Sequence, residues 1–214
     1  VNPAYKSTSF KAQEETADEV YLSIEELQRI QDVSIPESNE SMRVSCDLFL
    51  IGCYTGLRVS DYRRLSKEHV IEMGGRRFFK ITSEKTGSEV IIPIHPVVLA
   101  IMAERGDGLP PKQPAQRINR NIKLLGALAG IDQNVTLEKT IGGRKLKQTH
   151  PKYELIKTHT ARRSFCTNAY LMKMDCLDIM AVSGHTSEAN FLKYIKVTTR
   201  ERAKRIAEHA FFAV

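Results

Sequence analysis

The sequence lacks the features that would place a protein in a membrane or on the secretory route. No apolar run reaches the roughly 18 residues that a membrane-spanning helix needs. The first ten residues also lack the apolar core of a signal peptide. Internal repeats and low-complexity tracts are absent as well, which argues against a solenoid. We therefore expect a cytoplasmic protein whose 214 residues form one or two globular domains.

Cysteine and histidine are too few and too scattered to indicate a disulfide framework or a metal site. The four cysteines include no C-x-x-C pair, and each lies among apolar neighbours, which is typical of reduced thiols in a core. The six histidines form no H-x-x-x-H or H-E-x-x-H pair. We expect no structural or catalytic metal and no other cofactor. The cysteines are Cys46, Cys53, Cys166 and Cys176.

The charge that is present is mostly positive. Lysine and arginine total 32 against 25 aspartate and glutamate, which gives a formal net charge of +7 and a pI near 9.2. This balance suits a polyanionic partner without demonstrating one, because many basic proteins bind no nucleic acid. Hydrophobic residues make up 42% of the chain, which is enough for a substantial core.

The first third of the chain predicts an arm followed by three helices. Residues 1–20 show little apolar periodicity and read as a linker or arm. Ser23 and Glu26 form a capping box ahead of apolar residues at helical spacing, and Gly56 is a helix stop signal. The predicted helices cover 21–31, roughly 39–54, and a short segment capped by Ser60 that carries Asp61, Arg63 and Arg64.

The apolar period then changes from helical to alternating. Three short runs rich in β-branched and aromatic residues predict a three-stranded antiparallel sheet, and the turn between the second and third runs carries Lys85. The runs are 69–73, 76–82 and 89–94.

Helices and a second hairpin are predicted beyond this sheet. Arg117, Arg120 and Asn121 lie off the apolar face of one predicted helix, so this helix can pack inward and still face a phosphate backbone. The sequence suggests no role for the second hairpin. The predicted elements are a helix after His95-Pro96, a loop over 106–114, a helix over 115–129, and a hairpin over 133–157 around Gly142-Gly143.

Residues 159–194 gather two histidines, an arginine and a tyrosine into a stretch that reads mostly as helix. His159 and Arg162 are three residues apart, so a helix presents both on one face, where they could hold one anion. A glycine stop before His185 ends an apolar helical run and turns the chain back toward the first helix. Tyr194 lies nine residues further on, past a segment that starts with a serine cap signal.

These motifs, in this order, resemble the tyrosine recombinase (phage integrase) superfamily. H-x-x-R, then G-H, then the tyrosine is similar to the C-terminal active-site half of that family. TGLRVSDYRRL at 55–65 resembles the segment with its first catalytic arginine, and EKTGSEVIIPI at 84–94 resembles its β-hairpin lysine. The segment PKYELIKTHTARRSF at 151–165 is most similar to integrases of Bacteroides-type mobile elements. Five ordered matches are far more specific than any one of them.

The resemblance implies a fold and a domain organisation. The fold would be the tyrosine recombinase catalytic domain, mainly α with a small antiparallel β-sheet (α+β), over residues 21–214. Residues 1–20 would be the remnant of a linker or arm. A small DNA-clamping, core-binding domain usually precedes this domain in the family, so we expect the chain to be a fragment of a longer protein.

The resemblance also implies an activity, namely site-specific DNA recombination that proceeds through a 3′-phosphotyrosyl intermediate without metal or ATP. Tyr194 would be the nucleophile, because a phenol ester of phosphate is easily reversed and lets the strand be resealed. His159 would accept the phenol proton. The side chains that would stabilise the extra negative charge on the phosphate are Arg58, Arg162 and His185.

Two further residues take roles by the same resemblance. Lys85, on its turn, would act as the general acid that protonates the departing 5′-oxygen, although Lys80 is a rival in the same hairpin. Asp61, three residues after Arg58, matches an acidic position and would orient the active-site helix. Taken singly, each site residue has an ordinary explanation: a solvated lysine, a surface arginine, a satisfied histidine or a packed tyrosine. Taken together, six residues in one family's order and spacing make those explanations poor.

The expected partner is double-stranded DNA carrying recombination sites, bound by a homotetramer, although the isolated domain could be a monomer. A last helix capped by Thr198 or Thr199, together with an apolar chain end, could dock on a neighbouring protomer or pack on its own domain. A type IB topoisomerase-like enzyme and a non-cleaving DNA-binding protein on the same fold are the alternatives. Arg163 lies about 100° around the helix from Arg162. The basic residues that could contact the DNA backbone are Arg63, Arg64, Arg117, Arg120, Lys123 and Arg163.

Overall fold

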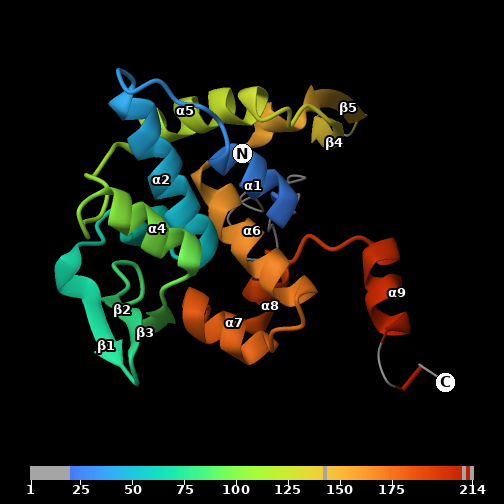
Figure 1. Cartoon of the computed structure of the whole chain (residues 1–214). Helices are drawn as coiled ribbons and strands as arrows, with labels where there is room; N and C mark the ends of the chain where they lie inside the picture. Colours follow the sequence, from blue (N-terminus) through green and yellow to red (C-terminus); the bar gives the residue numbers. More distant parts are fainter. Residues whose placement is uncertain (1–19, 142–143, 209–210, 213–214) are drawn as a thin grey trace, which may run out of the picture.

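The computed structural model describes residues 20–141, 144–208 and 211–212. The predicted arm over 1–20 therefore lies almost wholly outside the described residues, as does the Gly142-Gly143 turn of the second hairpin. The described chain is a group of packed helices with a small sheet at one side and a separate hairpin at another (Figure 1). None of its helices is long and apolar enough to cross a bilayer.

Two capped helices open the fold as predicted. Helix α1 (Ile24–Gln31) begins with a complete capping box: the Ser23 hydroxyl accepts from the Glu26 amide, and the Glu26 carboxylate accepts from the Ser23 amide at 2.7 Å. Helix α2 (Glu40–Thr55) ends at Gly56, whose φ of 67° is the left-handed conformation that glycine adopts without strain. Both boundaries agree with the sequence signals.

The next helix starts earlier than predicted. Helix α3 (Val59–Tyr62) has Arg58, not Ser60, as its N-cap residue, and no side chain caps it. Only one residue separates Arg58 from the end of α2 at Gly56, so the chain turns directly from one helix into the next. Ser60 consequently lies inside α3, and the predicted serine cap was wrong.

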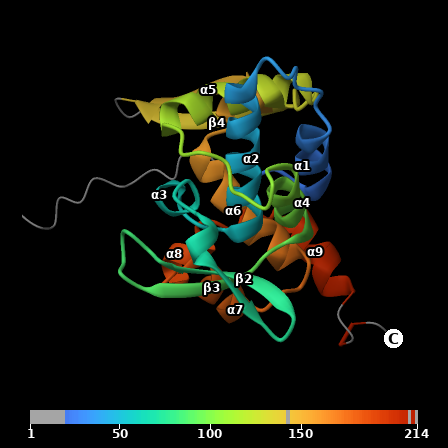
Figure 2. The same ribbon diagram turned by 60° about the vertical axis from the view of Figure 1, so that its left-hand side comes forward.

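The predicted three-stranded sheet is present, with antiparallel order β1-β2-β3. Its register pairs Phe79 with Ile92, and both side chains face the core with 0% and 1% exposure. The turn after the second strand carries Lys85, as predicted. Figure 2 shows the sheet along one edge of the helical body. The strands are β1 (Val70–Met73), β2 (Arg76–Thr82) and β3 (Glu89–Pro93).

Two helices follow the sheet, α4 (Pro96–Glu104) and α5 (Ala115–Leu128). The sequence placed Asn121 of α5 off the apolar face, but its side chain is buried and donates to the Ser45 hydroxyl at 2.9 Å and to the Ser41 carbonyl at 3.1 Å. This correction has a simple reason: a buried amide can lie on an apolar helix face when hydroxyl and carbonyl groups of α2 satisfy it.

The second hairpin is shorter than predicted. Its strands, β4 (Asn134–Ile141) and β5 (Arg144–Pro151), pair only with each other. Residues 152–155 were expected to extend the second strand, but they form the 3₁₀ helix η3 (Lys152–Leu155). Proline 151 closes the ladder because it has no amide proton, and the Lys152 ammonium then turns inward to both carboxylate oxygens of Glu26, each at 2.6 Å.

The C-terminal part is helical up to the predicted nucleophile. Gly184 ends the second of these helices with a φ of 68°, as expected for a glycine stop. Helix α9 begins with a capping box between Thr198 and Glu201, and it lies at the margin of the molecule in Figure 1. The helices are α6 (Thr158–Leu171), α7 (Cys176–Ser183), α8 (Glu188–Leu192) and α9 (Thr199–Ala207).

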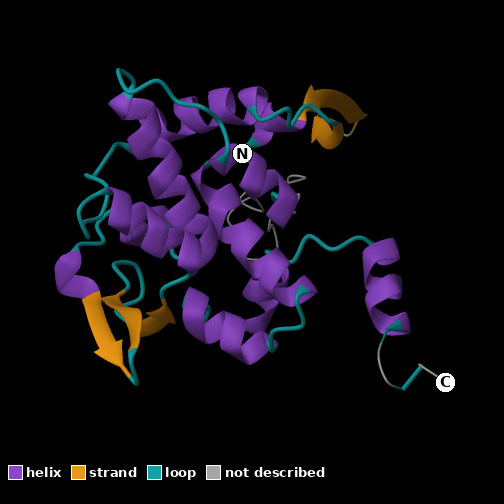
Figure 3. Cartoon of the chain, viewed as in Figure 1, coloured by secondary structure: helices purple, strands orange, loops and turns teal. Residues whose placement is uncertain are grey.

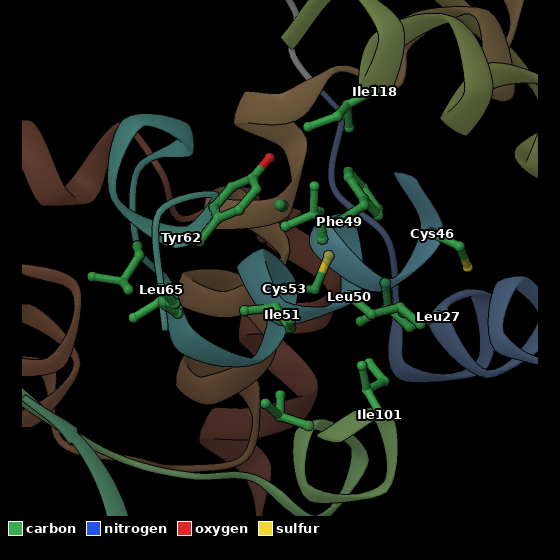
Figure 4. Close-up of a cluster of buried hydrophobic side chains, with 14 of the residues drawn as sticks. Leu27, Cys46, Phe49, Leu50, Ile51, Cys53, Tyr62, Leu65, Ile101 and Ile118 are labelled. Carbon is green, nitrogen blue, oxygen red and sulfur yellow. The ribbon is translucent and has the colours of Figure 1, made fainter. Parts of the chain in front are cut away.

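Helix α2 is the centre of the core, with α4, α5 and α6 packed around it. Side chains of α2 and of the elements around it form the largest apolar cluster, and Figure 4 shows several of its members. Close approach of α6 depends on Gly52, because an added Cβ would lie 2.7 Å from the Tyr62 ring and 3.0 Å from the Ala161 Cβ. A second cluster around Phe191 joins α6, α7 and α8. Figure 3 shows the helices predominating, which confirms the predicted fold class.

Candidate active site

Arg162 is the largest fully buried side chain of the described residues. It lies on α6 with 1% of its surface exposed, and its Nη1 donates to the Gly56 carbonyl at 2.8 Å and to the Ser183 carbonyl. Its Nε and Nη2 make no hydrogen bond of ordinary geometry within the described residues. Burial, followed by repulsion from Arg58, lowers the pKa of the Arg162 guanidinium, and the nearby Tyr194 phenol opposes that shift.

His185 lies beside this arginine. Its Nδ1 is 2.7 Å from the Ser183 hydroxyl, whose single proton can go either to this nitrogen or to the Ile179 carbonyl at 2.6 Å. The other ring nitrogen, Nε2, is buried without a hydrogen bond to a described residue. Burial, and then the positive charges of Arg162 and Arg58, lower the pKa of His185 to about 3. The imidazole is therefore neutral at physiological pH.

Tyr194 completes this group. Its residue lies in a turn directly after α8, so it is not itself helical. Its ring meets the His185 ring edge to face with centroids 4.7 Å apart, and the Arg162 guanidinium carbon lies 5.4 Å from its centroid. Thr167 of α6 fixes the backbone here, because its hydroxyl donates to the Tyr194 carbonyl at 3.0 Å and accepts from the Lys196 amide at 3.1 Å.

Arg58 approaches the same group from α3. It lies near enough to Arg162 and His185 that its charge lowers the pKa of both. Its Nη1 donates to the Ser83 hydroxyl at 3.3 Å. Within the described residues, neither Arg58 nor Arg162 forms an ion pair with a carboxylate. Two close, unneutralised cations favour an anion between them.

Asp61 connects Arg58 to the turn between β2 and β3. It is 1% exposed, and its carboxylate accepts from the Ser83 hydroxyl at 3.2 Å, from the Glu84 amide at 2.9 Å and from Arg64 at 3.2 Å. The Glu84 amide belongs to the turn that carries Lys85. Asp61 therefore holds the end of β2 and its turn against α3.

Lys85 and His159, the two predicted proton-transfer residues, are more exposed than Arg162 and its neighbours. Lys85 projects from the turn that follows β2 and is exposed, whereas its rival Lys80 lies within β2 and pairs with Glu89 at 3.2 Å. His159 is exposed in the first turn of α6, three residues before the buried Arg162. The structure thus brings Arg58, Arg162, His185 and Tyr194 together, and it leaves Lys85 and His159 toward solvent.

The basic residues suggested as DNA contacts divide into two groups. Arg117 and Arg120 are exposed at the start of α5 and Lys123 is partly exposed, so all three remain accessible. Arg64 instead pairs with Asp61 and donates to the Thr82 carbonyl, Arg63 is half-buried at the end of α3, and Arg163 lies 5.7 Å from the Tyr194 ring centroid. Arg64 and Arg163 therefore contact residues of the site itself.

Three hydroxyl residues of the site were not foreseen: Ser83, Thr167 and Ser183. Thr167 and Ser183 lie within the stretch 159–194, and Ser83 directly precedes the motif at 84–94, but small hydroxyl residues are common and nothing in their spacing marks them. In the part of the chain that the structure describes, no group of three or more histidine, cysteine, aspartate or glutamate side chains is arranged to hold a metal ion.

A family model matches almost the whole described chain. Residues 21–201 match the phage integrase family. The chain belongs to the phage integrase family. In this integrase, the matched range includes every residue of the candidate site, from Arg58 to Tyr194.

Solved structures share the fold. The integrase resembles XerA recombinase (TM-score 0.63, 20% identity, covering 89% of this chain and 65% of that one). It resembles a lambda integrase (75–356) dimer bound to a COC′ core site (TM-score 0.63, 14% identity, covering 90% and 64%). It also resembles XerH site-specific recombinase in a post-cleavage complex with palindromic difH substrate (TM-score 0.61, 15% identity, covering 88% and 53%).

These structural similarities show that the chain has the fold of a tyrosine recombinase catalytic domain. The integrase chain spans between about half and two thirds of the length of the three structures. No curated protein matches its sequence.

Proposed function

We propose that this integrase is the catalytic domain of a site-specific DNA recombinase, belonging to a mobile genetic element such as a phage or a conjugative transposon. It would cleave and rejoin DNA strands through a 3′-phosphotyrosyl intermediate and need neither metal nor ATP. The observation that carries the proposal is the convergence of two unneutralised arginines, a neutral histidine and a tyrosine on one place in the fold.

In the proposed cleavage step, the Tyr194 oxygen attacks the scissile phosphorus. The bond from phosphorus to the 5′-oxygen breaks, and the bond to Tyr194 conserves its energy for resealing. Arg58 and Arg162 stabilise the negative charge that builds on the non-bridging oxygens, because guanidinium groups keep their charge and offer paired donors. The Nε and Nη2 of Arg162 are the groups available to face those oxygens. The Nε2 of His185 can donate to them in the tautomer whose Nδ1 accepts from the Ser183 hydroxyl.

Two protons must move in the same step. The phenol loses one, for which His159 is the proposed acceptor, and the departing 5′-oxygen gains one, for which Lys85 is the proposed donor. Both residues lie in solvent-facing positions in the DNA-free chain, where bound DNA would contact them. Asp61 supports the reaction indirectly. It fixes the Lys85 turn, and the Ser83 hydroxyl links it to Arg58 through two hydrogen bonds.

Two other functions on the same fold would use part of this site. A topoisomerase of type IB would form the same covalent link but relax supercoils without joining two sites. A non-cleaving DNA-binding protein would need the basic surface but not the tyrosine. The complete set of cleavage residues favours a cleaving enzyme, and the family match to integrases favours recombination over relaxation.

A nicked suicide substrate tests the proposal. The full-length protein, incubated with a duplex that carries its own recombination site and a nick beside the scissile phosphate, should become covalently attached to DNA. Tyr194→Phe should bind the duplex and form no adduct. Attachment by the Phe variant would overturn the nucleophile assignment, and no attachment by the wild type would favour the binding protein. Exchange of strands between two sites then separates a recombinase from a topoisomerase.

The proposed working assembly is a homotetramer on two DNA sites, acting in the cytoplasm. The C-terminal helix is the natural element to reach a neighbour, but in the isolated chain it touches its own domain: Arg205 donates to the Tyr170 hydroxyl, and the Tyr21 hydroxyl donates to Glu201 at 3.2 Å. Phe211 and Phe212 are nevertheless 80% and 57% exposed, so these two side chains of the apolar chain end are not buried in cis. Its docking on a neighbouring protomer remains part of the proposal.

A further inference from the structure

Ser83 occupies the junction between the two parts of the site. It follows β2 directly and is 3% exposed. Its hydroxyl accepts from Arg58 Nη1 at 3.3 Å and donates to Asp61 Oδ2 at 3.2 Å. The direction of both bonds is fixed, because a guanidinium can only donate and an ionised carboxylate can only accept. The hydroxyl therefore lies in an ordered chain from the arginine to the aspartate.

The neighbouring residue ties the same carboxylate to the hairpin turn. The Glu84 amide donates to Asp61 Oδ1 at 2.9 Å, and Lys85 is the next residue along the chain. The turn is closed by backbone bonds from the Ser83 amide to the Ser88 carbonyl at 2.8 Å and from the Gly87 amide to the Ser83 carbonyl at 2.9 Å. Whatever orients Ser83 and Asp61 thus also sets the direction in which the Lys85 turn leaves the sheet.

The intervening hydroxyl has a second consequence, which concerns Arg58. A direct arginine–carboxylate pair commonly uses two parallel hydrogen bonds and would occupy two N–H donors on one edge of the guanidinium. Here the contact with Asp61 passes through one serine hydroxyl, so among the described residues Arg58 donates through Nη1 alone, and its other nitrogens remain available to an anion. Asp61 meanwhile pairs directly with Arg64 at 3.2 Å.

We propose that Ser83 is a positioning residue that couples the orientation of Arg58 to the placement of the Lys85 turn. This inference rests on the proposed function, in which the two residues act on opposite sides of the same phosphate. Without the hydroxyl, Arg58 loses its tether and can pair directly with Asp61, and Asp61 loses one of the bonds that hold it in register with the turn. Ser83→Ala therefore affects both the charge-stabilising and the proton-donating function.

The test uses two substrates. On an ordinary suicide duplex, the Ser83→Ala protein should form the covalent adduct about tenfold more slowly than the wild type, the loss expected for one hydrogen bond to a charged group. In a duplex with sulfur in place of the bridging 5′-oxygen, the leaving thiolate needs no proton, so misplacement of Lys85 no longer matters. On this substrate the loss of cleavage rate should be smaller but should persist, because the Arg58 side chain still lacks its tether to Ser83.

The result on the sulfur substrate decides the coupling. A defect unchanged by sulfur would mean that Ser83 acts on Arg58 alone, and a defect abolished by sulfur would mean that it acts on the turn alone. Either outcome overturns the proposal, as would an Ser83→Ala rate equal to that of the wild type. Ser88→Ala is the matched control at the other end of the same turn, where the bond uses the backbone carbonyl, and it should cleave normally.

A measurement that needs no cleavage separates this inference from the proposed function. Amide hydrogen exchange at Glu84 should be faster in Ser83→Ala than in the wild type and unchanged in Ser88→Ala. Because coupling is reciprocal, Arg58→Ala should speed the same amide. Ser83→Thr, which restores a hydroxyl, should recover slow exchange and most of the cleavage rate. Unaltered exchange at Glu84 would overturn the coupling, whereas a wild type that never attaches to DNA would overturn only the proposed function.

Discussion

The two halves of the candidate site are held in place by different means. The half formed by residues 158–194 depends on burial: Arg162 is 1% exposed, and the Phe191 cluster packs beneath Tyr194. The half formed by residues 58–88 depends on hydrogen bonds among Arg58, Asp61, Ser83 and Glu84, and its turn faces solvent. Arg162, which is proposed to offer a fixed charge, is thus packed rigidly, whereas Lys85, which is proposed to deliver a proton, stands on an exposed turn. Substitutions in each half should therefore fail in different ways.

The largest effect is expected in the buried half. Arg162→Ala removes two hydrogen bonds to backbone carbonyls and leaves a cavity, so we expect a loss of stability on the order of 3 kcal/mol and a fall in the cleavage rate of at least about 1000-fold. Urea unfolding and covalent-adduct rates measure the two. Arg163→Ala is the matched control, because that neighbour is only half-buried. Equal effects of the two variants would contradict the assignment of Arg162.

In the hairpin half, a change at the turn should affect the rate and spare the fold. Lys85→Ala is expected to slow adduct formation by about 100-fold, since a general acid contributes roughly that much, with an unchanged unfolding midpoint because the side chain is exposed. A 5′-sulfur leaving group should restore the rate. Lys80→Ala is the control in the same hairpin, and a larger effect there would transfer the general-acid role to Lys80.

An isosteric change sharpens the comparison within the buried half. Thr167→Val keeps the shape of the side chain but loses both hydrogen bonds to the Tyr194 segment, so adduct formation should slow by about tenfold. Ser164→Ala is the matched control on the same helix: its hydroxyl accepts from the Leu22 amide, so its loss should lower stability and leave Tyr194 in place. If Ser164→Ala slowed cleavage as much as Thr167→Val, the anchoring role would be refuted.

The last prediction concerns the dependence of stability on pH, which for one group is at most about 1.4 kcal/mol per pH unit. His185 has a pKa lowered to about 3 in the folded chain, against about 6.5 when unfolded. Between these values only the unfolded chain binds the proton, so this residue makes stability fall as the pH decreases from about 6.5 toward 3. The stability of His185→Asn should depend less steeply on pH across that window than that of the wild type. Parallel curves from chemical unfolding at several pH values would show that the folded imidazole titrates normally.

Much of this architecture could be predicted from local signals. The capping box at Ser23, the glycine stop at Gly56 and the β-rich runs of the sheet each depend on neighbouring residues, and each prediction was confirmed. The family motifs brought Arg58, Arg162, His185 and Tyr194 to attention, and the fold places them together.

The failures have a common physical cause, which is that they depend on partners distant in sequence. Asn121 is buried because Ser41 and Ser45 of another helix satisfy its amide. Ser83 matters because α3 presents Arg58 and Asp61 on either side of it. Short elements were also misplaced: the cap at Ser60 and the strand through residues 152–155 involve a few residues whose conformation the surrounding packing decides.

Gly52 ties the spacing of Arg58 and Arg162 to a single missing methyl group. The atoms that a Cβ would strike belong to Tyr62, four residues after Arg58, and to Ala161, directly before Arg162. A side chain there would push the Tyr62 ring of α3 and the Ala161 end of α6 away from α2, and so change the spacing between Arg58 and Arg162. The geometry of the candidate site is thus set partly in the interior of the helical body, at a residue that carries no side chain.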